Sequence, residues 1–211
     1  MTIIMTPTTS SASGLCTLGD IKLRLGESQT SVDNLINQII TNISALFDSF
    51  CRRILLVTAA SVTEYFTGEG LYLPLPRYPV VELTTVKEAY DYAFTTATAL
   101  TLNTDYRIIN GGLNGLLYRV NRQWCSLADS VQVVYRGGYC PAGVDPAAGE
   151  FALPADLREA AILQACLAFK RRDDLGLSGA GFDGGSFNKF ADLELLPVVK
   201  DILKLYQQTI L

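Results

Sequence analysis

Residues 130–172 read SVQVVYRGGYCPAGVDPAAGEFALPADLREAAILQACLAFKRR, and this stretch decides the fold. Its first part, Val131–Tyr135, has the composition of a strand and leads into Arg136-Gly137-Gly138-Tyr139. Its second part predicts a helix from Leu153 to Arg172. Nine of the ten residues from 160 to 169 are apolar, so this helix has no polar face. A helix that is apolar all round packs on several sides, and we therefore expect it at the centre of the molecule.

The composition excludes several classes of function. The chain has 211 residues and no histidine, which excludes Ser-His-Asp and Cys-His catalysis, histidine metal sites and histidine proton shuttles. The net charge of −4 gives no basic balance that would indicate nucleic-acid binding. No apolar run approaches the roughly 18 residues of a membrane span, and the first residues lack the features of a signal peptide. The five cysteines are widely spaced, which favours reduced, buried thiols in a cytosolic protein.

Two helices are expected before the β-rich region. Thr17 and Asp20 can form a capping box for a short helix that Gly26 ends. The second helix has Thr30 or Ser31 as its expected cap and continues to Arg52-Arg53. Its apolar positions recur at helical spacing: Val32, Leu35, Ile36, Ile39, Ile40, Ile43, Leu46, Phe47 and Phe50.

The other face of the second helix is polar but carries only two charges. Solvent-facing helices usually carry charged pairs, whereas uncharged amides and hydroxyls are compatible with a hydrated protein–protein contact. The alternative is compositional drift, because only 18% of the chain is charged. The face consists of Asp33, Asn34, Asn37, Gln38, Thr41, Asn42, Ala45, Asp48 and Ser49. From it we select as candidate interface residues Asn34, Asn37, Gln38, Thr41 and Asp48.

The spacing changes to a period of two after residue 53. Strands are expected at Ile54–Thr58, Ser61–Phe66, Leu71–Leu73 and Val80–Ala89, and Pro74, Pro76 and Pro79 favour a sheet edge between the last two. A hairpin is expected from Asp105–Ile109 and Leu113–Val120 around an Asn-Gly-Gly turn. Three arginines lie among aromatic residues, a mixture that either contacts nucleic acid or packs on a sheet with its charges in solvent: Arg119, Arg122 and Arg136. The second interpretation is favoured because the chain is acidic.

A glycine-rich loop, residues 174–188, follows the central helix, and a last helix is expected from Asp192 or Pro197 to Gln208. The loop contains Gly179-x-Gly181-x-x-Gly184, the letters of the dinucleotide-binding fingerprint. That fingerprint needs a strand before the glycines and a helix after them, and here a helix precedes them. The favoured interpretation is therefore a functional or disordered loop, with a nucleotide-binding enzyme as the alternative.

The layout predicts an α+β fold: a small bundle of about four helices with an antiparallel β-rich insertion between its second and third main helices. We expect a flexible arm at residues 1–14 and a single domain at residues 15–211. Within that domain, residues 15–53 and 154–211 form the bundle and residues 54–139 form the insertion. No catalytic residues, cofactor or metal ligands are predicted.

Taken in order, these segments resemble the head–tail connector (adaptor, or head-completion) proteins of tailed bacteriophages. The resemblance covers residues 15–208 and rests on an ordered set of motifs: Cys16–Gly26, Phe50–Arg53, Leu71–Pro74 with Pro79–Leu83, Val131–Tyr139 and Leu153–Ala160.

The resemblance implies a non-enzymatic structural protein of the virion neck, assembled in the host cytoplasm. It implies a homo-oligomeric ring, commonly of twelve subunits, that docks on the portal protein and carries a downstream neck or tail protein. Viral DNA would pass through the ring without sequence-specific binding, and no membrane is involved. The polar helix face, the terminal arm and the loop, with Gly181 and Phe182, are the expected contacts. Another neck or tail-completion protein is the alternative.

Overall fold

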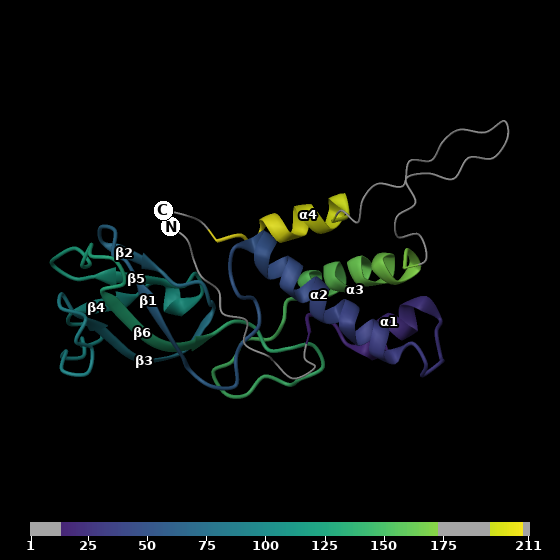
Figure 1. The fold of residues 1–211 in the computed structure, drawn as a ribbon, viewed down its shortest axis with the longest axis horizontal. Helices are drawn as coiled ribbons and strands as arrows, with labels where there is room; N and C mark the ends of the chain where they lie inside the picture. Colours follow the sequence, from purple (N-terminus) through teal and green to yellow (C-terminus); the bar gives the residue numbers. More distant parts are fainter. Residues whose placement is uncertain (1–13, 173–194, 209–211) are drawn as a thin grey trace.

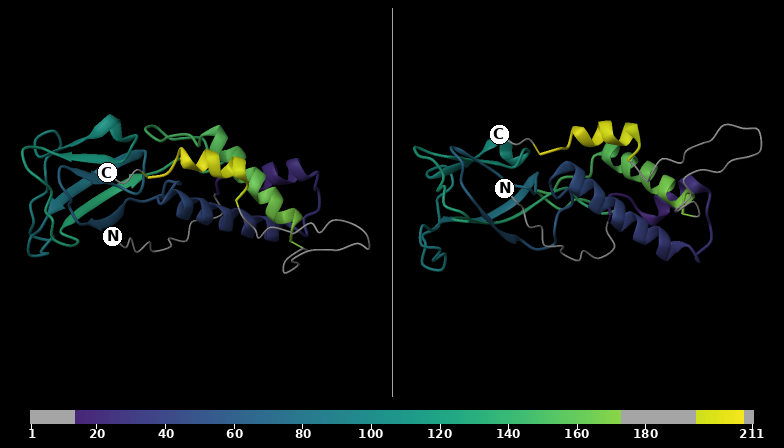
Figure 2. Two further views of the ribbon diagram at one scale, coloured as in Figure 1. Left: turned by 90° about the horizontal axis from the view of Figure 1, so that it is seen from above. Right: turned by 45° about the horizontal axis from the view of Figure 1, so that its top comes forward.

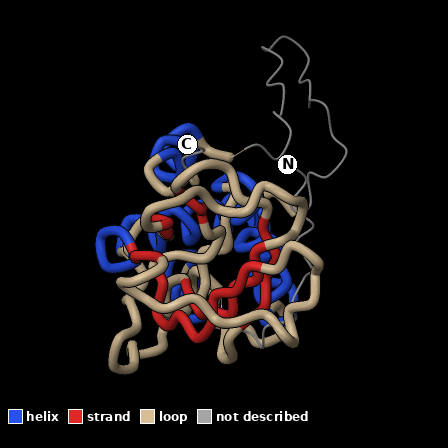
Figure 3. Tube along the Cα trace, turned by 90° about the vertical axis from the view of Figure 1, so that its left-hand side faces the viewer, coloured by secondary structure: helices blue, strands red, loops and turns tan. Residues whose placement is uncertain are grey.

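We describe a computed structural model of the chain, which covers residues 14–172 and 195–208. The molecule is elongated, with helices at one end and β structure at the other (Figure 1). The same separation holds in the turned views (Figure 2), and the strands lie in front of the helices when the molecule is viewed from its β end (Figure 3). The expected arm (except for its last residue) and the glycine-rich loop, with Gly181 and Phe182, lie outside the described residues.

The helical part consists of α1 (Leu18–Leu25), α2 (Asp33–Cys51), α3 (Ala155–Lys170) and α4 (Pro197–Lys204). α3 contacts the other three helices, which confirms the central position predicted from its apolar sequence. Its one polar residue in that run, Gln164, is fully buried. The Gln164 side-chain oxygen accepts a hydrogen bond from the Leu196 N–H at 3.0 Å, and this bond fixes the start of α4. The last helix therefore begins at the later of the two expected positions and ends before Gln208.

The two N-terminal helices begin differently. At α1 the predicted capping box is present: the Asp20 N–H donates to Thr17 Oγ1 at 3.1 Å, and the Thr17 N–H donates to Asp20 Oδ2 at 2.9 Å. The expected Thr30 or Ser31 cap of α2 is wrong. Val32 occupies the cap position with backbone angles that are already helical, and it offers no side-chain acceptor.

The β part consists of two three-stranded antiparallel sheets. The first has the order β1 (Val62–Phe66), β6 (Val131–Gly137), β3 (Val80–Glu88). The second has the order β2 (Tyr72–Pro74), β5 (Leu116–Arg119), β4 (Tyr106–Ile108), and a short 3₁₀ helix at Ile109–Gly112 joins β4 to β5. The fold is thus the predicted α+β arrangement, with the sheets between α2 and α3 in the chain.

Some strand predictions are wrong in detail. Residues 54–58 form no strand, because Ile54 and Leu56 make only single bridges, to Arg77 and Tyr139. β1 pairs with β6, and β2 pairs with β5 in the other sheet. The expected hairpin of β4 and β5 is present.

The Gly137-Gly138 pair lies where the β part joins the helical part. A Cβ atom on Gly137 would lie 2.3 Å from the Arg77 carbonyl oxygen, so only glycine fits. Gly138 has a φ of +117°, and a Cβ there would lie 2.6 Å from the carbonyl carbon of Leu56. This close backbone crossing lets the Tyr139 N–H donate to the Leu55 carbonyl at 2.7 Å, which fixes the β part onto the end of α2.

Candidate assembly surfaces

The polar face of α2 is open to solvent along most of its length. Asn34, Asn37, Gln38 and Thr41 are exposed, as the candidate interface requires. The Thr41 hydroxyl donates to the Asn37 carbonyl at 3.0 Å. Uncharged groups of this kind cost less to desolvate than charges do, so the face suits a protein contact.

Asp48 differs from the other four candidates on this helix. It is half-buried, and its Oδ1 accepts a hydrogen bond from the Leu55 N–H at 2.9 Å. Burial raises its pKa from the ordinary 3.8 to about 6, although the Leu55 N–H, Arg77 and Arg53 act in the opposite direction. The structure therefore places Asp48 at the end of α2, where it supports the chain leaving the helix.

A groove of about 440 Å³ lies between the helical part and the β part. Its lining includes Arg53 just after α2, Tyr78 between β2 and β3, Tyr139 just after β6, and Leu205 just after α4. The Arg53 guanidinium carbon stacks 3.3 Å from the centre of the Tyr78 ring. The sequence alone indicates only that Arg53 lies at a helix end. Its burial depends on contacts with Tyr78 and Tyr139, which are distant in the chain and which no local pattern signals.

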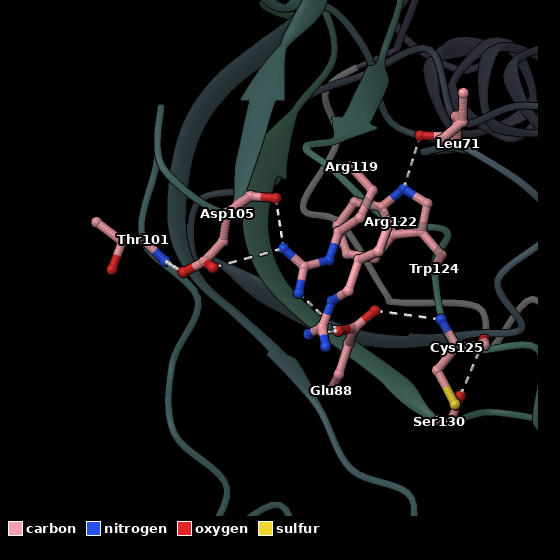
Figure 4. A network of polar contacts seen from close by, with 9 residues as sticks. All are labelled: Leu71, Glu88, Thr101, Asp105, Arg119, Arg122, Trp124, Cys125 and Ser130. Atoms are coloured by element: carbon pink, nitrogen blue, oxygen red, sulfur yellow. Dashed lines mark hydrogen bonds and ion pairs between the residues drawn. The ribbon is translucent and has the colours of Figure 1, made fainter.

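The aromatic–basic mixture of the β part is an internal network rather than a nucleic-acid surface (Figure 4). Arg119 is 1% exposed, its Nη2 pairs with Glu88 Oε2 at 3.0 Å, and its guanidinium lies over the Trp124 ring. Arg122 reaches the same carboxylate from the surface at 2.8 Å. The expectation of solvent-exposed arginines is thus wrong for Arg119, whose charge is neutralised by a partner on β3.

A second ion pair lies in the β part and involves Glu64. Glu64 on β1 pairs with Arg77 at 2.9 Å and accepts a hydrogen bond from the Tyr135 hydroxyl at 2.6 Å. Burial, followed by the Glu64 charge, raises the pKa of Tyr135 well above 10, so this hydroxyl stays protonated. The Glu64 carboxylate is therefore occupied by internal donors.

The remaining reactive groups are buried or dispersed. All five cysteines are free and buried, as the sequence predicts, and burial raises the pKa of Cys16 and of Cys51 to about 12. Within residues 14–172 and 195–208, no three metal-binding side chains come together. In the same part of the chain, no helix is long and apolar enough to cross a membrane.

Comparison with solved structures identifies the architecture. A chain from the neck of an empty GTA particle computed with C6 symmetry superposes with a TM-score of 0.59 at 14% identity, over 99% of this chain and 97% of that one. The chain has the fold of this neck protein. A chain from the neck of the native GTA particle, computed with C12 symmetry, gives 0.55 at 12% identity over 99% and 97% of the two chains. A chain from the virion of the native gene transfer agent (GTA) particle gives 0.52 at 16% identity over 92% and 90%.

The similarity to the neck chain includes both the helical part and the β part, because the match extends over nearly the whole of each chain. It agrees with the resemblance to head–tail connectors seen in the sequence motifs. No protein-family model matches the sequence, and no curated protein matches it.

Proposed function

We propose that this protein is a head-to-tail adaptor of a phage-like particle. Copies of the chain form a ring, commonly of twelve subunits, below the portal protein. The ring extends the DNA channel and provides the platform for the next neck or tail protein. The observation that carries this proposal is the neck fold, which matches over 99% of the chain.

Two further features support a structural role. The buried arginines of the β part are engaged in internal ion pairs, Arg119 with Glu88 and Arg77 with Glu64. The exposed face of α2 offers uncharged polar groups for contact with another subunit or with the portal. The proposed role requires surfaces of defined shape and no chemical step.

The proposal is tested in a particle-producing strain in which the gene is deleted and then restored on a plasmid. We expect deletion to give DNA-filled heads without tails, and restoration to return tailed particles. Electron microscopy of particles with an epitope-tagged copy should place the label at the neck. Tailed particles that form normally without the gene, or a label on the tail tip or capsid shell, would exclude the adaptor function.

The α2 face is tested by the pair Asn37→Glu and Thr41→Glu, which adds two like charges to an exposed surface. The free energy of unfolding should change by less than about 0.5 kcal/mol per position, as is usual at exposed sites. Incorporation into particles, measured by immunoblot of purified particles, should fall severalfold because the new charges must be desolvated in the contact.

The matched control for this pair is Gln123→Glu with Ser126→Glu, two exposed positions in the β part. This control should enter particles at the normal level. Equal incorporation of the α2 variant and the control would show that this face makes no contact in the assembly.

A further inference from the structure

The groove between the two parts of the molecule has a buried positive charge in its wall. Arg53 is 1% exposed, its Nη2 donates to the Tyr78 carbonyl, and its Nε is buried without a hydrogen-bond partner. The arginine forms no ion pair with any carboxylate of the described chain. A buried cation that stacks on an aromatic ring but has no carboxylate partner is costly, so this groove favours an occupant that brings a negative charge.

The carboxylates of Asp48 and Asp156 are already engaged in other hydrogen bonds. Asp48 accepts the Leu55 N–H. Asp156 accepts a hydrogen bond from the Tyr206 hydroxyl at 2.6 Å. Neither of them forms an ion pair with Arg53, although the Arg53 charge acts to lower the pKa of Asp48.

The rest of the groove indicates what else the occupant carries. Leu113 and Leu205, which line it, are 55% and 79% exposed, so apolar surface is available for contact. The Asn114 side-chain oxygen, also in the lining, is buried and has no donor. Together these groups favour an extended segment with an apolar side chain, a carboxylate and a free backbone N–H.

The chain itself presents such a segment elsewhere on its surface. Residues 143–149, between β6 and α3, are all exposed, and Val144 is 53% exposed. The neighbouring Asp145 side chain makes no hydrogen bond or ion pair with the described residues. Glu150 holds the base of this loop, because it accepts the Ala147 N–H at 3.1 Å and pairs with Arg136 at 2.9 Å. The loop is thus preorganised, with its apolar and acidic groups directed to solvent.

The loop and the groove lie on different sides of the molecule. In Figure 1 the green segment between β6 and α3 runs along the lower edge, whereas α4 and the residues after it lie along the upper edge. Two complementary patches on opposite sides of one chain generate a head-to-tail contact, and such contacts form a ring when the rotation between neighbouring copies closes. We infer that residues 143–149 of one copy insert into the Arg53 groove of the next copy, with Asp145 supplying the missing negative charge.

This inference rests on the proposed ring and names the contact that closes it. It is tested with the double substitution Asp145→Cys and Leu205→Cys, expressed in the particle-producing strain. The native cysteines are buried and do not interfere. Purified particles are oxidised and resolved on a non-reducing gel, where we expect a ladder of multiples of the chain mass that reduction abolishes. A disulfide forms only where the two Cα atoms approach within about 7 Å.

Each single cysteine variant, and the pair Glu69→Cys with Leu205→Cys, serve as controls and should give no ladder. Particles that contain the protein but give no ladder, or give the same ladder with the Glu69 pair, overturn the inference and leave the adaptor proposal standing. A cross-link from the cysteine introduced at position 205 to a protein of different mass overturns it as well. Particles that never contain the protein contradict the adaptor proposal itself.

The charge is tested separately with Asp145→Lys, which should lower incorporation into particles about tenfold because two cations then face each other in the contact. Glu69→Lys makes the same charge change at an exposed turn of the β part and should leave incorporation unchanged. Equal incorporation of the two variants overturns the role of Asp145.

Discussion

The Asp48 carboxylate accepts a hydrogen bond from the Leu55 N–H. Burial raises its pKa from 3.8 to about 6. Between these two values the native protein binds a proton that the unfolded chain has already lost. The free energy of unfolding therefore falls as the pH rises from about 4 to 6. Above pH 6 the full loss of stability caused by the buried charge is present.

Replacing this residue with asparagine should stabilise the protein at neutral and alkaline pH. Asp48→Asn keeps an oxygen for the Leu55 N–H and removes the charge that burial disfavours. We expect the free energy of unfolding at pH 8 to rise by up to about 3 kcal/mol, since one pKa unit corresponds to about 1.4 kcal/mol. Urea unfolding at pH 4, 6 and 8 measures the effect. The exposed Asp201→Asn is the control, and a variant no more stable than wild type at pH 8 would contradict the assignment.

Among the elements, the Glu88–Arg119 pair joins the two sheets, because Glu88 ends β3 and Arg119 ends β5. Glu88 also accepts the Cys125 N–H at 3.1 Å, so the carboxylate organises the loop after β5 as well (Figure 4). Both side chains are at most 3% exposed. Removing Arg119 therefore leaves the buried Glu88 carboxylate with only its surface partner Arg122.

Arg119→Met should lower the free energy of unfolding by roughly 3–5 kcal/mol. Adding Glu88→Gln removes the buried charge that has lost its main partner but keeps an acceptor for the Cys125 N–H, so we expect the double variant to be less destabilised than the sum of the singles by roughly 1–3 kcal/mol. Urea unfolding of the wild type, the two single variants and the double variant at pH 7 gives the coupling energy between the two residues. Arg122→Met, at the exposed partner of the same carboxylate, should cost less than about 1 kcal/mol. Additive effects would argue that the two sheets are held together by packing alone.

Local signals in the sequence predicted the elements but not all of their partners. The apolar run in α3 and the Thr17–Asp20 box each lie within a short stretch of chain, and both predictions were confirmed. The pairing of β1 with β6 joins residues about 70 positions apart, and nothing in either strand distinguishes that partner from β2. For the same reason Arg119 looked like a surface charge, because its partner Glu88 lies 31 positions earlier.

Of the two candidate surfaces, one could be predicted from the sequence and the other could not. Helical periodicity alone placed the exposed polar face of α2, because burial of one side of a helix is a local property. The Arg53 groove could not be predicted, since its walls come from separate stretches of the chain that only the folded state brings together.

At the scale of the whole molecule, the described chain has two separate hydrophobic cores. One lies among the four helices and includes Leu157, and the other lies between the sheets and includes Leu117. The parts meet through a few backbone hydrogen bonds, among them the bond from the Tyr139 N–H to the Leu55 carbonyl, and through the stacking of Arg53 on Tyr78. A part with its own core can open without the other, so the two parts should respond separately to mutations in their cores.

Two matched substitutions test this independence, since Leu117 and Leu157 are both fully buried. Each change to alanine removes the same group and should cost about 2–5 kcal/mol in its own core. Native-state hydrogen exchange should show faster exchange in β5 and β6 for Leu117→Ala, with protection in α3 retained. Leu157→Ala should give the reverse pattern. Equal acceleration of both parts by either variant would mean that the backbone crossing at Gly137-Gly138 couples them into one cooperative unit.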